Sequence, residues 1–352
     1  MQISDKTTLV FDVGDTLIKL DKNFSGKMIN WPELEIVSGA DHILKTLSQV
    51  FEIVIASNAE DSDAMDVKKA MQRVGLSSYI HQYFTVNELK AKKPDPLFYK
   101  NLMSALNKSA DQLIMIGDDY QKDILSAVSV GMHTIWFNQL NRTATAQFPI
   151  QEKECFSLIE IPQIIQSPSL PDMQTCIFWY LQQNATSTLL AHVSTVAAAA
   201  YQLALWLKNQ GIFISPLLSH RGGFLHDISK LKENGVENHA ILASRFLENK
   251  GQPELASIAR RHLIGDLNSA ENKPMTWEEK VVNYCDKLTE GSELVSLDHR
   301  LDALKLRYKD FADKIQKNTP VVKELENEIL MPLNLSPEDA IIQLKTSLFN
   351  GS

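Results

Sequence analysis

Two different patterns of apolar and polar residues divide the chain of 352 residues into two halves. Between residue 7 and about residue 140, short apolar runs alternate with amphipathic stretches of helical period. The apolar runs predict strands at TTLVF, FEIVIAS, YFTV, LIMIGD and HTIWF, and the intervening stretches predict helices. Because strands that alternate with helices form parallel sheets covered on both faces, we expect an α/β domain over residues 1–145.

The pattern changes after residue 140. The stretch FPIQEKECFSLIEIPQIIQSPSLPD has four prolines and no apolar stripe, which predicts a connector over residues 146–171. Residues 172–352 have mostly helical spacing and no convincing strand, which predicts an all-α second domain. The apolar run at residues 188–207 contains His192, Ser194, Thr195 and Gln202, so it is expected to be a buried helix and not a membrane span.

Composition and charge narrow the class of protein. A content of 44% hydrophobic and 22% charged residues is typical of a soluble globular chain, and its length favours two domains. The net charge of −8 argues against a protein-wide attraction to nucleic acids or acidic membranes. Three scattered cysteines indicate no disulfide framework, and the N-terminus has no signal-peptide pattern. We therefore expect a cytoplasmic protein.

Four polar clusters in the first half sit just after apolar runs that predict strands: FDVGDT, IASNAED, KKPDP and IGDDYQKD. Side chains beyond the carboxyl ends of parallel strands meet at one edge of the sheet. A carboxylate such as Asp12 can attack phosphorus, and Ser57 and Lys93 can hold phosphoryl oxygens. Asp12 and Asp118 can bind Mg²⁺, which prefers oxygen ligands. The pattern therefore favours phosphoryl transfer, although each of these residues alone is more often a turn or surface residue.

With these four motifs in this order, the sequence from about residue 7 to residue 140 resembles the haloacid dehalogenase-like hydrolase superfamily. The resemblance implies a Rossmann-like sheet and a Mg²⁺-dependent phosphatase site. It assigns Asp12 as the nucleophile, Ser57 and Lys93 as phosphate-binding groups, Asp118 as a metal ligand and Asp123 as a supporting acid at the metal.

Gly14 departs from the pattern of the family's phosphatases, which usually carry a second Asp at this position as general acid and base. Such catalysis typically contributes about 10²–10⁴-fold, so its loss predicts a slow phosphatase or a domain that binds phosphate without turnover. Asp15 is one residue off, and its side chain is expected to point elsewhere. The stretch before the next helix is too short for a helical cap, and we expect residues 23–34 to form a plain surface loop rather than a flap.

The helical half contains a second set of candidate ligands: His192, His226, Asp227, His239, His262 and Asp286. Imidazoles and carboxylates on separate helices can converge on one or two metals inside a bundle. A carboxylate that bridges two metals about 3.5–4 Å apart can hold an attacking hydroxide between them. Taken alone, His192 on an apolar face is more often a core residue, and His220 and His299 fit no ligand position.

The order His, His-Asp, Asp resembles the HD-domain metal-dependent phosphohydrolase superfamily over residues 172 to about 290. The resemblance implies that His192, His226, Asp227 and Asp286 bind one metal and that His239 and His262 serve a second, with a single metal as the alternative. The metals would be divalent transition ions such as Mn²⁺, Fe²⁺, Zn²⁺ or Ni²⁺, and Lys230 would contact phosphate. For the basic cluster LKLRYK in the C-terminal stretch, a solvated helix face is favoured, and contact with a phosphate-rich ligand is the alternative.

The sequence thus predicts a two-domain metal-dependent phosphohydrolase. The second centre would hydrolyse a phosphoester or phosphoanhydride, with a nucleotide-type small molecule favoured and a nucleic-acid end left open. The first domain would be a second phosphatase weakened by Gly14. The alternative is a phosphate sensor without turnover that regulates the second domain. A non-enzymatic interaction protein is a third class, and the intact His/Asp set argues against it.

Overall fold

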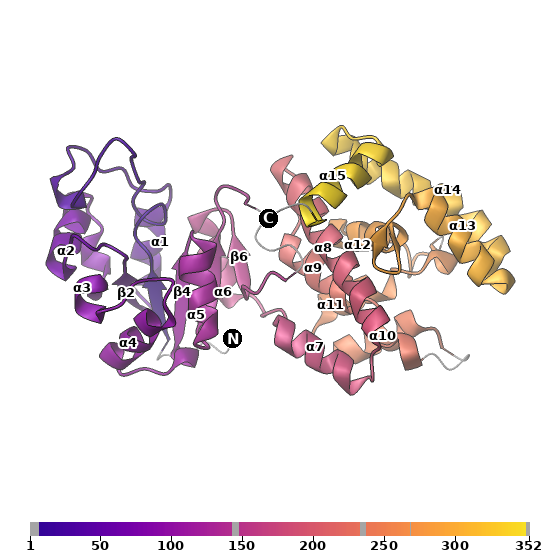
Figure 1. Ribbon diagram of the computed structural model, residues 1–352, viewed down its shortest axis with the longest axis horizontal. Coiled ribbons are helices and arrows are strands. Elements are labelled where there is room, and N and C mark those ends of the chain that lie inside the picture. Colours follow the sequence, from indigo (N-terminus) through magenta and orange to yellow (C-terminus); the bar gives the residue numbers. More distant parts are fainter. Residues whose placement is uncertain (1–6, 143–147, 233–236, 268, 350–352) are drawn as a thin grey trace. The chain divides into compact units, whose positions relative to one another are not determined.

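The computed structural model describes residues 7–142, 148–232, 237–267 and 269–349, which form two compact units (Figure 1). The first unit comprises Met1–Arg142 and Ile150–Ser169, and the second comprises Thr143–Pro149 and Leu170–Ser352. The first unit contains a sheet with helices, and the second is almost entirely helical. The predicted order, an α/β half followed by an all-α half, is confirmed.

A parallel six-stranded sheet forms the centre of the first unit. Its strand order is β3-β2-β1-β4-β5-β6, and every pair of neighbours is parallel. The bounds are β1 Thr8–Phe11, β2 Glu52–Ala56, β3 Gln82–Phe84, β4 Leu113–Gly117, β5 His133–Phe137 and β6 Lys153–Cys155. Because β1 and β4 are adjacent, the residues that follow them lie together at the middle of the carboxyl edge.

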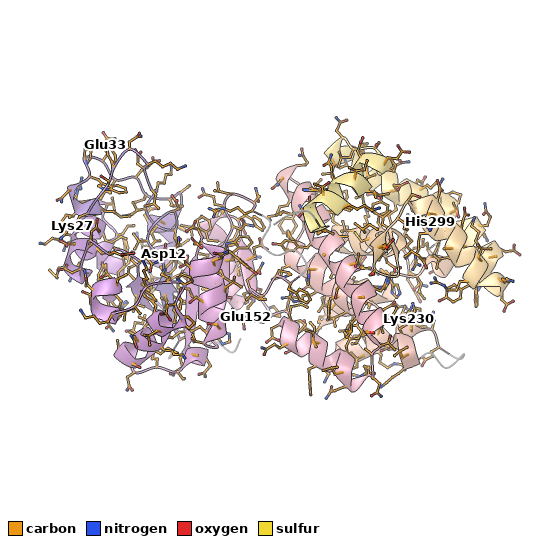
Figure 2. All side chains as sticks on the ribbon, viewed as in Figure 1. Asp12, Lys27, Glu33, Glu152, Lys230 and His299 are labelled. Carbon is orange, nitrogen blue, oxygen red and sulfur yellow. The ribbon has the colours of Figure 1, made fainter. Side chains whose placement is uncertain are left out.

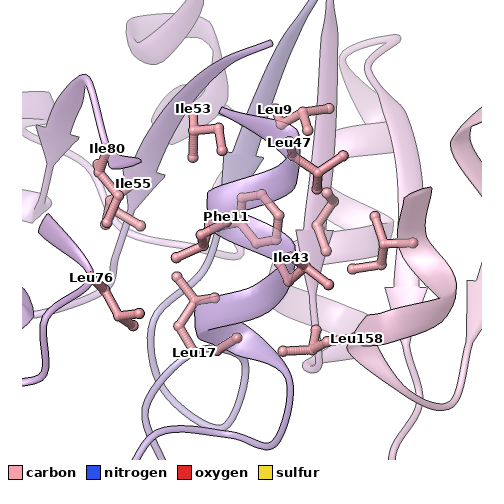
Figure 3. Packing of buried hydrophobic residues seen from close by; sticks show 14 of the residues in the cluster. Leu9, Phe11, Leu17, Ile43, Leu47, Ile53, Ile55, Leu76, Ile80 and Leu158 are labelled. Carbon is pink, nitrogen blue, oxygen red and sulfur yellow. The ribbon is translucent and has the colours of Figure 1, made fainter. Parts of the chain in front are cut away.

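Helices cover both faces of this sheet, as alternating apolar runs predict. The helices are α1 Ala40–Leu47, α2 Ala64–Arg73, α3 Val86–Leu89, α4 Pro96–Leu106, α5 Ser126–Ser129 and α6 Ile161–Gln166. On one face, Phe11 and Ile55 of the sheet pack with Ile43 and Leu47 of α1 (Figure 3). On the other face, Val10 belongs to a cluster with residues of α3, α4 and α5.

Part of the segment predicted as a connector belongs to the sheet unit. Residues 153–155 form β6, which pairs with β5, and α6 follows it. The strand is three residues long with the sequence KEC, which is too short and too polar to stand out as a strand pattern. Cys155 is nevertheless completely buried, and Ile161 and Ile165 of α6 complete the core of the α1 face.

The second unit packs its helices around α8. Its helices are α7 Met173–Gln182, α8 Ser187–Asn209, α9 Pro216–Leu225, α10 His239–Asn249, α11 Pro253–Arg260, α12 Trp277–Lys287, α13 Leu297–Arg307, α14 Ala312–Leu330 and α15 Pro337–Phe349. A hairpin of two short antiparallel strands, β7 Thr289–Glu290 and β8 Glu293–Leu294, follows α12 and was not predicted.

Helix α8 is long and apolar enough to cross a membrane, but 67% of its most apolar window is buried inside the fold. Helix α9 packs against it at very short range. A Cβ atom on Gly223 would lie 2.9 Å from the Cα atom of Ala197, so only glycine permits this approach. The close packing brings the C-terminal end of α9 beside the first turns of α8, and the predicted buried helix is the core helix of this unit.

Candidate functional sites

The first site lies at the carboxyl edge of the sheet. Asp12 directly follows β1, and its backbone N–H donates to the carbonyl of Ile116 in β4 at 3.0 Å. Asp118 directly follows β4, and its backbone N–H donates to Oγ1 of Thr16 at 3.2 Å. Gly117 ends β4, and a Cβ atom there would lie 2.3 Å from Oδ2 of Asp123. Only glycine at this position leaves room for the Asp123 carboxylate.

Lys93 is the central cation of this site. Its side chain is buried, and its Nζ donates to Oδ1 of Asp12 at 2.7 Å and to Oδ1 of Asp123 at 2.6 Å. The side chain of Asn58 holds the Lys93 backbone through two hydrogen bonds of 2.8 Å, one to its N–H and one to its carbonyl. Although burial lowers the pKa of Lys93, the charges of Asp12 and Asp123 raise it above its ordinary value, so Lys93 is a fixed positive charge.

The donor set of this site suits a hard divalent cation. Asp12, Asp118 and Asp123 each offer an oxygen atom, and these atoms lie within 4.8 Å of one another. Burial, together with the charge of Asp12, raises the pKa of Asp118 to about 6. Burial also raises the pKa of Asp123 to about 7, although Lys93 opposes the shift. Buried carboxylates this close repel one another unless a proton or a cation intervenes, and Mg²⁺ fits an all-oxygen set.

A cavity of about 440 Å³ adjoins these groups. Ser57 lines it together with Asp12, Lys93, Asp118 and Asp123, so the structure brings all five predicted residues of the first site to one place. Figure 2 labels Asp12, which marks this first site in the first unit, and Lys230, which belongs to the second site in the second unit. The roles that we assign to these five residues remain proposals.

Residues 23–34 are part of this cavity and not the plain surface loop that was expected. Four residues of the segment line the cavity: Gly26, Met28, Ile29 and Trp31. The guanidinium of Arg73 on α2 donates to the carbonyl of Ile29 at 2.7 Å and to that of Pro32 at 3.2 Å. These long-range bonds fix the segment, which is a small flap on the cavity wall. Sequence periodicity could not reveal them, because Arg73 is distant along the chain.

The structure shows where Gly14 and Asp15 stand. Oδ1 of Asp15 accepts a hydrogen bond from the backbone N–H of Leu20 at 2.9 Å, and its backbone has a φ of 53°. The Asp15 carboxylate therefore braces a turn, and Asp15 also lines the cavity. The atoms nearest to a Cβ atom on Gly14 would be those of the Leu20 side chain, at 3.0 Å, and that side chain is half-exposed.

The second site gathers side chains from three helices, α8, α10 and α12, and from the segments that follow α9 and α11. His192 lies on α8, His226 and Asp227 follow α9, and Asp286 lies on α12. Nε2 of His192 lies 3.2 Å from Oδ1 of Asp286, and Nε2 of His226 lies 3.6 Å from the same atom. His239, the first residue of α10, and His262, just after α11, complete the group of six predicted ligands.

Backbone carbonyls set the orientation of three of these imidazoles. Nδ1 of His192 lies 3.0 Å from the carbonyl of Gly291, and Nδ1 of His226 lies 2.7 Å from that of Gly223. Nδ1 of His262 lies 2.7 Å from the carbonyl of Ala259. A carbonyl only accepts, so each Nδ1 carries the proton and each Nε2 presents a lone pair to the cluster. Histidines that bind metals in proteins show this arrangement.

Asp227 lies at the centre of the cluster. Its Oδ1 is 3.1 Å from Nε2 of His239 and 3.4 Å from Nε2 of His262, and Lys230 Nζ is 3.1 Å from its Oδ2. Although burial raises the pKa of Asp227, the positive charge of Lys230 holds it well below its ordinary value. Burial lowers the pKa of His262 to about 4, so that imidazole is neutral.

Two buried atoms at this centre have no hydrogen-bond partner: Oδ1 of Asp227 and Nε2 of His226. A buried polar atom without a partner costs free energy, and a metal ion between imidazole and carboxylate ligands removes that cost. Two sets of three ligand atoms lie within 4.8 Å: one from His192, His226 and Asp286, and one from His226, Asp227 and His262. The residues present therefore fit one or two divalent transition metals.

Residues missed by the sequence analysis also line this site. A cavity of about 590 Å³ adjoins the cluster. Its wall includes the buried Lys287 and also Arg307 and Tyr308 from the C-terminal segment that begins with α13, which we call the tail. Lys287 Nζ donates to Oδ2 of Asp286 at 3.0 Å and to the carbonyl of His262. Arg307 and Tyr308 of LKLRYK are exposed and also line the cavity, which favours the alternative of a ligand contact for these two residues. The signal that the sequence offered for a ligand contact was an aromatic residue, Tyr308, directly after a cationic one, Arg307.

Comparison with known proteins identifies both halves. The model of the haloacid dehalogenase-like hydrolase family matches residues 8–137, and that of the HD domain matches residues 189–291. The first region is therefore a haloacid dehalogenase-like hydrolase domain and the second an HD domain. The predicted resemblances and the predicted class, a phosphoric ester hydrolase, are confirmed at this level. Both families depend on metals, in agreement with the two ligand clusters. We refer below to the HAD-like domain and the HD domain.

Similar proteins cover parts of the chain. An uncharacterized protein of Methanocaldococcus jannaschii is 31% identical over 156 residues, which make up 41% of this chain and 88% of that protein. A glyceraldehyde 3-phosphate phosphatase of Pyrococcus furiosus is 33% identical over 94 residues, 27% of this chain and 39% of the relative. The crystal structure of a HAD phosphatase of Thermococcus onnurineus is 16% identical and covers 47% of this chain and all of that chain, with a TM-score of 0.38.

Proposed function

We propose that the HD domain hydrolyses a phosphoester or phosphoanhydride bond in a nucleotide-type small molecule. The observation that carries this proposal is the convergence of four imidazoles and two carboxylates in one cluster, in which His239 and His262 face Asp227 and His192 and His226 face Asp286. A nucleic-acid end is the alternative substrate. We also propose a cytoplasmic location. The proposed first domain comprises residues 1–145 together with β6 and α6, and the proposed second domain comprises residues 172–352.

The residues of the HD domain have distinct parts in this proposal. Divalent ions such as Mn²⁺, Fe²⁺, Zn²⁺ or Ni²⁺ would be held by the six His and Asp ligands, and they would activate water for attack on phosphorus. The carbonyls of Gly223, Gly291 and Ala259 fix the imidazole orientation. Lys230 keeps Asp227 ionised and is open to the cavity, where it can bind a phosphoryl oxygen.

For the HAD-like domain we propose a second, slower phosphatase site that uses Mg²⁺. Asp12 would attack the phosphoryl group, Lys93 and Ser57 would bind its oxygens, and Asp118 and Asp123 would complete the metal site. The position of Gly14 has no side chain to protonate the leaving oxygen, and Asp15 is engaged with Leu20. The second candidate is a sensor that binds phosphate through Lys93 without turnover, and the same absence of an acid favours it.

Variants at each site can separate these possibilities. Purified wild type, Asp12→Asn and Asp227→Asn would be tested for phosphate release from a panel of nucleotides and sugar phosphates, with Mg²⁺ or Mn²⁺. Loss of nucleotide hydrolysis in Asp227→Asn alone supports the HD domain as the enzyme and the sensor role of the first domain. Loss of different substrates in the two variants supports two enzymes. Full activity in Asp227→Asn with its HD ligands metal-free contradicts the proposal.

A further inference from the structure

The cavity at the HD domain's ligand cluster has a wall that lies outside the region matched by the HD family. That match ends at residue 291, whereas Arg307, Tyr308, Phe311 and Lys314 line the cavity together with the metal-ligand candidates. These residues lie at the end of α13, at the start of α14 and in the short segment between them. The tail therefore completes the cavity and supplies chemistry that the ligand cluster lacks.

The tail is tied to the ligand cluster through Glu290. Arg300 and Arg307 of α13 both donate to the carboxylate of Glu290, one oxygen each. Glu290 lies in β7, four residues after Asp286, and its neighbour Gly291 accepts the hydrogen bond from Nδ1 of His192. The same short hairpin thus orients a ligand imidazole and positions the tail residues of the cavity.

Two aromatic rings of the tail remain partly open to solvent at this wall. Tyr308 is 42% exposed and Phe311 is 53% exposed, and both line the cavity. Lys314 Nζ lies 5.5 Å from the centre of the Phe311 ring. Large aromatic side chains usually bury their area, so flat rings left open beside a ligand cavity offer stacking surfaces. Apolar side chains beside them, including Leu304 and Ile315, extend this part of the wall.

The lining of the cavity combines two kinds of chemistry. Its imidazoles, carboxylates and Lys230 suit a phosphoryl group and metals. Its flat rings, aliphatic side chains and the cation of Lys314 suit a planar and weakly polar group. A ligand that carries both a phosphate and a heterocycle matches both kinds of lining. The cavity volume of about 590 Å³ is within the range of roughly 300–1,000 Å³ of sites that bind small molecules.

We propose that Tyr308 and Phe311 are specificity residues that contact the base of a nucleoside monophosphate whose phosphate lies at the His/Asp cluster. This inference rests on the proposed function of the HD domain and names the substrate class of the same site. Stacking on aromatic rings tolerates every base, so the tail distinguishes nucleotides from sugar phosphates and does not select one base.

The test compares AMP and UMP with ribose 5-phosphate, which has the phosphate but no base. Stacking is worth about 1–3 kcal/mol per base, so Tyr308→Ala and Phe311→Ala should each raise KM for both nucleotides by at least about fivefold. The kcat values should change little, and kcat/KM for ribose 5-phosphate should remain as in wild type. Tyr308→Phe should retain most of the nucleotide affinity, because it keeps the ring.

Leu306→Ala is the matched control, because Leu306 lies in the last turn of α13 just before Tyr308, is 74% exposed and is not among the residues that line the cavity. It should leave all values unchanged. Equal losses on nucleotides and ribose 5-phosphate in the alanine variants would indicate a structural role for the rings and overturn the inference. Unchanged nucleotide kinetics would also overturn it. Metal content and circular dichroism establish that each variant is folded and loaded.

Failure of the proposed function has a different signature. If metal-loaded wild type releases phosphate from none of the three compounds, hydrolysis is contradicted, and equilibrium dialysis with AMP decides the inference. Binding of AMP that weakens at least about fivefold in Phe311→Ala supports the base contact without turnover. Binding that is equal in wild type and variant, or absent from both, overturns it.

Discussion

The Nε2 atoms of His239 and His262 lie 3.2 Å apart, and both face Oδ1 of Asp227. The Nδ1 atom of His262 is committed to the carbonyl of Ala259, so its Nε2 has a lone pair and no proton of its own. A cation between these groups would satisfy all three atoms at once. The pair His239/His262 is therefore the structural argument for a second metal.

We predict that the HD domain of wild type retains two transition-metal ions and that His262→Gln retains one. His192, His226 and Asp286 remain together in the variant, and their ligand atoms lie within 4.8 Å of one another. Metal content per chain, measured by mass spectrometry after dialysis against Mn²⁺, checks the prediction. His299→Gln is the control, because His299 is exposed on α13 (Figure 2). A second metal retained by His262→Gln would contradict the assignment.

Replacement of Gly14 tests why the HAD-like domain should be slow. We expect Gly14→Asp to increase phosphatase activity of that domain by about 10²-fold or more, because it supplies the absent general acid and base. The atoms nearest to the new Cβ belong to Leu20, whose side chain is half-exposed and can move aside. The measurement is kcat on sugar phosphates with Mg²⁺ in an Asp227→Asn background, where the second site is disabled.

Gly14→Asn is the matched control, because it has nearly the same shape and cannot transfer a proton at neutral pH. The kcat of Gly14→Asn should stay at the value of the protein with Gly14. Equal activity in the Asp and Asn variants would show that proton transfer at this position does not limit the reaction.

The affinity of the HAD-like domain for Mg²⁺ should rise with pH. The pKa of Asp118 is raised to about 6 and that of Asp123 to about 7, so both carboxyls must lose protons for the metal to bind. A carboxyl with a raised pKa stabilises the metal-free fold below its ordinary pKa, and this contribution is lost as pH increases through 6 and 7. Mg²⁺ should therefore raise the melting temperature more at pH 8 than at pH 5.

Thermal melts with and without Mg²⁺ across this pH range check the expectation. Asp118→Asn should remove most of the Mg²⁺ effect, because it takes one ligand and one titrating group from the cluster. A Mg²⁺-induced shift of equal size at pH 5 and pH 8 would contradict the assignment of these carboxyls as ligands.

Arg221 should be important for the stability of the second unit. Its buried guanidinium donates to the carbonyls of Pro171 and Pro149, both at 2.8 Å, and contacts His220. These two prolines precede and follow the residues 150–169 that belong to the first unit. Arg221→Met should lower the free energy of unfolding by about 2–4 kcal/mol, because two buried carbonyls lose a charged donor, and that of Pro171 keeps the weak thiol donor of Cys176 at 3.8 Å.

Denaturant unfolding monitored by circular dichroism measures this effect. Arg245→Met is the comparison, since Arg245 forms an exposed ion pair with Glu237, and such pairs contribute about 0–1 kcal/mol. Similar losses in the two variants would mean that the buried bonds of Arg221 add no stability.

The sequence determined the class of both domains and the identity of most candidate ligands. Strand and helix periods are local, so β1 to β5 and the long helices could be predicted from the order of apolar residues. Polar residues that follow parallel strands meet at one edge of the sheet. The sequence alone therefore predicts that Asp12 and Asp118 lie close together. The spacing of His226, Asp227 and Asp286 gave the second cluster through its resemblance to the HD domain.

The tertiary structure decided the features that depend on contacts between distant residues. Strand β6 is recognisable only because β5 pairs with it, and residues 23–34 become a flap only because Arg73 holds their carbonyls. Tyr308 and Phe311 look like surface residues in the sequence, and only the packing of the tail places them at the cavity. Local patterns specify elements, whereas the walls of a site depend on long-range hydrogen bonds and packing that no local pattern contains.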